Sequence, residues 1–97
     1  MTKNTEDKKH VLVRTKSAGV HFGRLLERHG LEVLLADARR IWSWQGANTL
    51  HEIALHGVGR GSKISEAVST IVLTEAIELL ACSAQAVASL EAATWGE

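Results

Sequence analysis

The segment VHFGRLLERHGLEVLL, residues 20–35, predicts two strands joined by a tight turn. The first strand covers residues 20–28, where apolar and polar side chains follow a strand-like spacing. His29 and Gly30 form the turn, because glycine adopts a positive φ without steric cost. Residues 31–35 then form the returning strand. The segment therefore predicts an antiparallel hairpin as the centre of the fold.

The flanking residues extend this hairpin on both sides. In HVLVRT, residues 10–15, Val11 and Val13 point to one face, and Leu12 and Arg14 point to the other. This alternation predicts a strand. Residues 38–44 predict a fourth strand. Short strands joined by short turns favour an α+β fold, in which one or two short helices accompany a small antiparallel β-meander or barrel-like sheet. We expect residues 1–9 to be a flexible tail and residues 10–97 to form a single small domain.

A short helix is predicted over residues 50–56. Thr49 is a suitable N-cap, and Glu52 follows three residues later, as in a capping box. Apolar residues recur at helical spacing through the segment, which gives the helix one buried face. Gly57 suits the end of the helix, where a left-handed conformation is common.

The last third of the chain is ambiguous between strand and helix. Its Ala, Leu and Glu content favours a helix, whereas residues 68–73 are rich in β-branched side chains. Ser83 is a suitable N-cap for a helix over residues 84–92. We therefore expect strand structure around residues 68–80, followed by that helix.

The composition places the chain among small globular proteins of a reducing compartment. Its 97 residues are 45% hydrophobic and 23% charged, and Cys82 is the single cysteine. No apolar run approaches the ~18 residues that a membrane span requires. The first residues, MTKNTEDKKH, lack the apolar segment of a signal peptide. We therefore expect no membrane association and a cytoplasmic location.

The charges are unevenly distributed, although the net charge is zero. Residues 8–63 contain ten Lys or Arg and four acids, whereas residues 64–97 contain five acids and no base. The two parts can pair within one fold or between copies of the chain, or one of them can face a charged ligand. The neutral balance argues against strong general binding to nucleic acids.

HEIALH, residues 51–56, resembles the H-E-x-x-H motif of zinc peptidases but does not complete it. His51 and His56 are five residues apart, so they point about 140° away from each other on a helix. Zinc binding by this motif needs histidines at i and i+4 on one face. No other catalytic set is visible, and we expect no metal, no cofactor and no catalytic residues.

GVGRGSK, residues 57–63, resembles a phosphate-binding loop but has the wrong order. A P-loop places its lysine directly after a glycine and then a hydroxyl residue, and it follows a strand. Here Ser62 separates Gly61 from Lys63, and the loop follows a helix. An NTPase is therefore disfavoured. Two readings stay open: an exposed connection, or a loop whose amides, Arg60 and Lys63 hold a phosphate.

ARRIWSWQGA, residues 38–47, contains two of the three tryptophans and a pair of arginines. On a strand, Arg40, Trp42 and Trp44 share one face, and a cation beside two indoles can stack a base and hold a phosphate. The alternative is that these indoles anchor a core or an oligomer interface. The candidate ligand-binding residues are Arg39, Arg40, Trp42, Trp44, Arg60 and Lys63.

Three segments resemble a family of small phage and prophage proteins: GVHFGRL, LLADARRIWSWQGANTLHEIALHG and VLTEAIEL. The resemblance covers about residues 10–90 and is most distinctive over residues 38–57. Members of that family often have Pro and Cys after the helix glycine, where this chain has Gly-Arg-Gly-Ser at residues 59–62, although Lys63 matches. The resemblance implies a viral origin and provides no catalytic residues.

Two functions agree best with these observations. The first is a non-enzymatic phage protein in the host cytoplasm that counters host defence, by sequestering a nucleotide-like signal or by blocking a host protein. The second is a virion structural or assembly component that forms symmetric oligomers, which the charge split and the apolar C-terminal third favour. A small enzyme has the least support. In either case we expect a homo-oligomer, because 97 residues make only a modest core.

Overall fold

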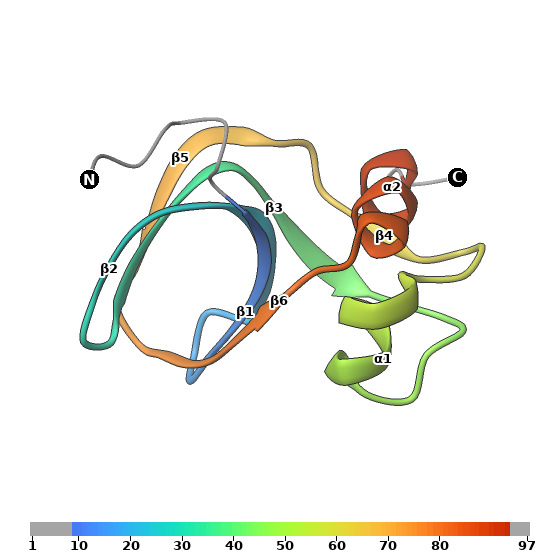
Figure 1. Cartoon of the computed structure of the whole chain (residues 1–97), viewed down its shortest axis with the longest axis horizontal. Helices are drawn as coiled ribbons and strands as arrows, with labels where there is room; N and C mark the ends of the chain where they lie inside the picture. The colour runs from blue at the N-terminus through green and yellow to red at the C-terminus, as the bar shows by residue number, and fades with distance from the viewer. Residues whose placement is uncertain (1–8, 94–97) are drawn as a thin grey trace.

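The computed structural model describes residues 9–93, which form six strands and two helices (Figure 1). The elements are β1 (His10–Thr15), β2 (Val20–His29), β3 (Glu32–Ser43), α1 (Leu50–His56), β4 (Lys63–Ile64), β5 (Val68–Leu73), β6 (Ala76–Ala81) and α2 (Ala84–Ala92). The expected α+β class, the antiparallel sheet and the two short helices are confirmed.

The sheet is an antiparallel meander whose ends are extended by later strands. β1 pairs with β2 and β2 with β3, and β4 and β5 both pair with the other side of β3. β6 pairs with β1 and lies at the opposite end of the sheet. Figure 1 shows the strands curling into an open ring, with both helices on one side of it. The result is the barrel-like form of the meander.

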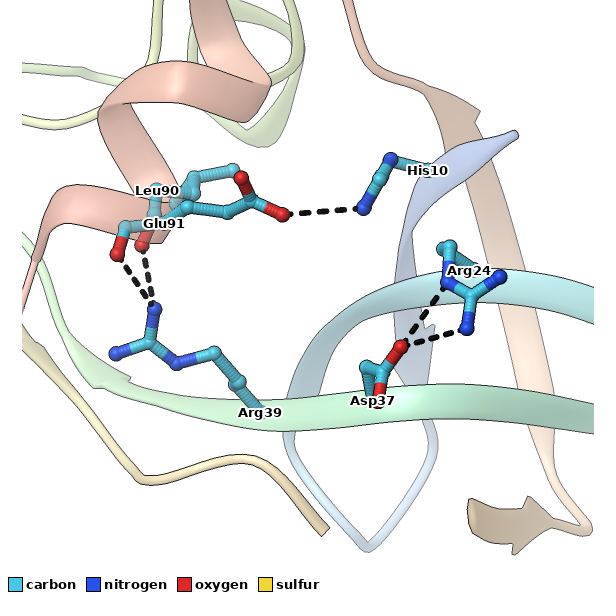
Figure 2. Close-up of polar contacts among 6 residues, drawn as sticks. All are labelled: His10, Arg24, Asp37, Arg39, Leu90 and Glu91. Carbon is cyan, nitrogen blue, oxygen red and sulfur yellow. Dashed lines mark hydrogen bonds and ion pairs between the residues drawn. The ribbon is translucent and has the colours of Figure 1, made fainter. Parts of the chain in front are cut away.

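Residues 32–43 form one continuous strand, so the prediction of separate strands over 31–35 and 38–44 is wrong. The two parts are joined through Asp37, whose φ is 51° and which interrupts the register between β2 and β3. Aspartate tolerates this conformation better than most residues. Its carboxylate accepts bonds of 3.1 and 2.6 Å from the Nε and Nη2 atoms of Arg24, which hold the bulge in place (Figure 2).

The region predicted as a strand over residues 68–80 is strand, but it is divided into two. Thr74 and Glu75 separate β5 from β6. β5 pairs with β3 whereas β6 pairs with β1, so this short link connects the two ends of the meander. The link is also fixed to the sheet, because Lys16 donates to the Glu75 carbonyl and Ala76 donates to the Leu31 carbonyl.

Two apolar clusters lie on opposite faces of the curled sheet. The inner cluster contains Val11, Val13, Val33, Leu35, Ala38 and Leu73. The outer cluster lies between the sheet and the helices and contains Leu12, Phe22, Ile41, Ile53, Ala54, Ile64 and Leu90. The alternation predicted for residues 10–15 explains this arrangement, because β1 sends Val11 and Val13 inward and Leu12 toward the helices.

The helices begin where the sequence predicts and are joined by side-chain hydrogen bonds. Thr49 and Ser83 accept bonds from the amides of Glu52 and Ala86 and thereby cap α1 and α2. The Glu52 carboxylate accepts from the amide of Asn48 rather than from the cap residue itself. At the end of α1, Ser89 of α2 bonds to both backbone groups of Val58.

We expect Gly57→Ala to lower the free energy of unfolding by about 2 kcal/mol or more. Gly57 is buried with a φ of 87°, and an added Cβ would overlap the side chain of Ser89 in α2. Gly30→Asn is the control, because Gly30 has a φ of 60° and open space around it. Urea denaturation measures both variants. Equal stability of the two variants would contradict the close contact between α1 and α2.

The stability should also fall on acidification because of His21. This side chain is buried, and its Nε2 lies 2.9 Å from the Ala18 carbonyl oxygen. Burial lowers the pKa of His21 below its usual value of 6.5; the Ala18 contact opposes this effect and the charge of Arg40 adds to it. Protonation therefore favours the unfolded chain, and the contribution present above pH 6.5 is lost as the pH falls below that value.

Urea denaturation at pH 7 and at pH 5 measures this effect. His21→Gln should reduce the loss of stability between the two pH values relative to the wild-type chain. An unchanged pH dependence in His21→Gln would show that other groups cause it.

Candidate binding groove between α1 and β6

Arg39, a predicted ligand-binding residue, binds the protein's own backbone. From β3, its guanidinium donates to the carbonyls of Leu90 and Glu91 at 2.9 and 3.3 Å (Figure 2). It also donates to the carbonyl of Ala93. Its Nε donates to the Ser65 carbonyl at 2.7 Å. The last turn of α2 contains no basic residue, so Arg39 provides the cation that a helix C-terminus favours. These contacts give Arg39 a structural role.

The Arg-Trp segment is divided between two places. Arg40 and Trp42 lie on the face of β3 opposite to Arg39 and Ile41, as the strand period predicts, and both are exposed, Trp42 to 64%. Trp44 lies beyond the end of β3 and packs, half-buried, against the outer cluster. The three side chains therefore do not form one continuous stripe. Base stacking at Arg40 and Trp42 remains a prediction.

The glycine-rich loop after α1 uses most of its polar groups within the protein. The amide of Gly59 donates to the Gln45 carbonyl at 2.7 Å, and the amide of Val58 donates to Ser89. The Ser62 hydroxyl accepts from the Gln45 amide and donates to the Gly59 carbonyl. These hydrogen bonds hold the loop against the segment that follows β3. Arg60 is exposed and Lys63 begins β4, and a role for these two residues in holding a phosphate remains a prediction.

A hollow of about 410 Å³ lies where the start of α1 faces β1, β2 and β6. Trp44, Val20 and Leu50 supply apolar walls. Arg14 of β1 and Glu78 of β6 face each other here, with an N–O distance of 3.8 Å. Asn48, Thr49 and His51 complete the lining. One half of the hollow is thus apolar, and the other half is polar with a compensated charge pair.

A second hollow of about 400 Å³ lies between α1 and β6. Apart from His51, its lining residues have apolar side chains: Ala54, Leu55, Leu79, Leu80 and Ala81. Leu55 projects from α1 with 57% of its surface exposed. Both hollows include His51 in their lining, so they adjoin each other between α1 and β6. We call the two hollows together the α1–β6 groove.

Cys82 is half-buried directly after β6. Burial raises the pKa of the Cys82 thiol to about 11, so this thiol stays protonated at neutral pH and is a poor nucleophile. Within residues 9–93, no three metal-ligating side chains gather into a group that could hold a metal ion. His51 and His56 lie on α1 as expected, and only His51 lines the groove. In the same part of the chain, no helix is long and apolar enough to cross a membrane.

Of the predicted site residues, only Trp44 lines the groove. Sequence reasoning missed Arg14, His51 and Glu78 as members of one site, since they come from three elements distant in the chain. The Arg14–Glu78 pair follows from the register of β1 against β6, and that register is visible only once β6 is separated from β5. The sequence draws attention to His51 only through its resemblance to a zinc motif, and that motif is incomplete.

The described residues thus define a small α+β domain in which two helices cover one face of a curled antiparallel sheet. A family profile with the description "Domain of unknown function (DUF6948)" matches residues 8–90, and the chain belongs to this family. No curated protein and no solved structure matches the chain.

We expect Arg39→Lys to lower the free energy of unfolding by about 1.5–3 kcal/mol, the range for hydrogen bonds made by charged groups. A lysine places a single ammonium where the guanidinium reaches several carbonyls at once. Arg40→Lys, one position along on the exposed face, is the control and should change stability by less than about 0.5 kcal/mol. Chemical denaturation compares them, and equal effects would argue against the capping role.

Proposed function

We propose that the protein is a non-enzymatic binding protein that attaches to a segment of another protein through the α1–β6 groove. The observation that carries this proposal is the pair of open hollows that adjoin at His51 and are lined by both apolar and polar side chains. Apolar clefts with a few oriented polar groups are typical binding sites. In the phage setting that the sequence resemblance implies, the target is a host defence protein in the cytoplasm.

The charges of the groove favour a protein target over a nucleotide-like signal. Phosphate groups require surplus positive charge. In the groove, the cation Arg14 faces the carboxylate of Glu78, and Arg39, Arg60 and Lys63 lie elsewhere. A polypeptide segment, with apolar side chains and polar backbone groups, matches this lining better.

A virion or assembly role is the second candidate, and the exposed edge of β5 favours it. β5 has the sequence VSTIVL, with no charged residue or proline. The exposed fractions of Val68 and Val72 are 51% and 59%. Natural proteins usually protect such edges, because they pair with other chains. Pairing of this edge with a second copy would give the expected homo-oligomer. Presence of the protein in purified particles would support this candidate.

Affinity purification with a matched pair of variants tests the proposed function. Leu55→Arg places a charge in the apolar half of the groove, whereas Val68→Arg changes a similarly exposed apolar residue on β5. Wild type and Val68→Arg should recover the same host protein in stoichiometric amounts, and Leu55→Arg should lose it. Retention of that protein by Leu55→Arg would contradict the groove as its site.

Native mass spectrometry of the purified protein, before and after denaturation, distinguishes this proposal from the alternative that the protein sequesters a nucleotide-like signal. The proposal predicts no released nucleotide. A nucleotide that is released from wild type and Leu55→Arg, but is absent from Trp42→Ala, would overturn the proposal in favour of sequestration.

A further inference from the structure

Beyond Ala76, whose amide donates to the Leu31 carbonyl, the strand β6 has a free edge within residues 9–93. It ends the hydrogen-bonded path of the sheet and pairs only with β1 among the described strands. Cys82, in line with β6, donates its amide to the His10 carbonyl at 3.0 Å. Since alternate residues of an antiparallel strand bond to the same neighbour, Leu80 also bonds to β1. The backbone groups of Leu79 and Ala81 therefore point toward the free edge.

The surface is hollowed at both ends of this edge. The apolar half of the α1–β6 groove touches Leu79, Leu80 and Ala81 in succession. A further hollow, of about 290 Å³, touches residues 76–79 and is completed by Arg28, Gly30, Leu31 and Val33 from the β2–β3 hairpin. Consecutive side chains lie on opposite faces of a strand, so a hollow that touches a run of them lies at the strand's edge.

We propose that β6 binds an extended segment of the partner protein as an added strand. This inference rests on the proposed function and specifies how the partner binds. The backbone of the segment bonds to the free groups of Leu79 and Ala81, as in β-augmentation. Its alternate side chains enter the hollow beside Leu55 and the hollow beside Leu31. Since Ala76 is already bonded to Leu31, the segment lies along residues 77–81 and is about 17 Å long.

The charges along the edge specify the chemistry of the segment. Arg28 lines the hollow of the β2–β3 hairpin, and within residues 9–93 no carboxylate lies within ion-pair distance of it. Glu78, the acid on β6, already faces Arg14 at 3.8 Å. The edge therefore offers one uncompensated positive charge. The segment carries apolar side chains at alternate positions and a carboxylate that meets Arg28.

A free segment matches this edge better than the β5 edge of a second copy does. The occupant has to offer free side chains along its length, because the two hollows lie at the two ends of the edge. On β5, Leu73 is buried and Ile71 packs against the inner cluster, so one of its faces is already occupied. An extended segment of a partner has both faces available.

Selection from a displayed library of random linear peptides, followed by backbone N-methylation of the best binder, tests this inference. Selected peptides should share alternate apolar positions and an acidic residue, and Leu55→Arg should abolish their binding. N-methylation should weaken binding about tenfold at every second residue and leave the intervening residues unaffected, because only alternate amides bond to β6. Arg28→Gln should remove the preference for the acidic residue.

Hydrogen exchange of the complex gives a second readout. The amides of Leu79 and Ala81 should exchange more slowly with the peptide bound, while those of β5 are unchanged. Binding that depends on Leu55 but shows no two-residue N-methylation period would overturn strand addition and leave the proposed function standing. A library that yields no binder sensitive to Leu55→Arg would overturn both. Conversion of an oligomer to a monomer by Leu55→Arg would identify a second copy as the occupant instead.

Discussion

The burial of β1 on both faces is the constraint on which the rest of the structure depends. Leu12 is fully buried toward the helices, and Val11 and Val13 are buried in the interior of the ring. A strand buried on both sides needs a neighbour along each edge, because its amides and carbonyls cannot reach water. β2 and β6 provide these neighbours. The groove exists because β6 has to lie beside β1 while α1 covers the face that carries Leu12.

The local elements could be predicted from the sequence, since their signals lie within a few residues. The period of residues 10–15, the Gly30 turn and the caps Thr49 and Ser83 all predict structure that is present. The continuity of β3 could not be predicted, because it depends on Arg24 holding Asp37 in an unusual conformation. The break at residues 74 and 75 was equally hidden, as neither residue is Gly or Pro.

The candidate site was less accessible to sequence reasoning than the fold was. Arginine, glycine and tryptophan attract attention in a sequence, but here several of them support the protein's own backbone. Arg39 bonds to carbonyls near the end of α2, and Gly59 contacts the segment after β3. The side chains of the groove are ordinary ones brought together by strand register. A resemblance to a motif indicates residue types, whereas a site depends on which atoms are still free after folding.

The pairing of β1 with β6 has a consequence for how the chain folds during synthesis. The first strand bonds to a partner about seventy residues later in the chain, so the sheet closes only after most of the chain has left the ribosome. Until then the edge of β1 that pairs with β6 has no partner within the chain. The newly made protein therefore passes through a stage at which chaperones and neighbouring nascent chains have access to that edge, and the speed of translation through β5 and β6 sets how long this stage lasts.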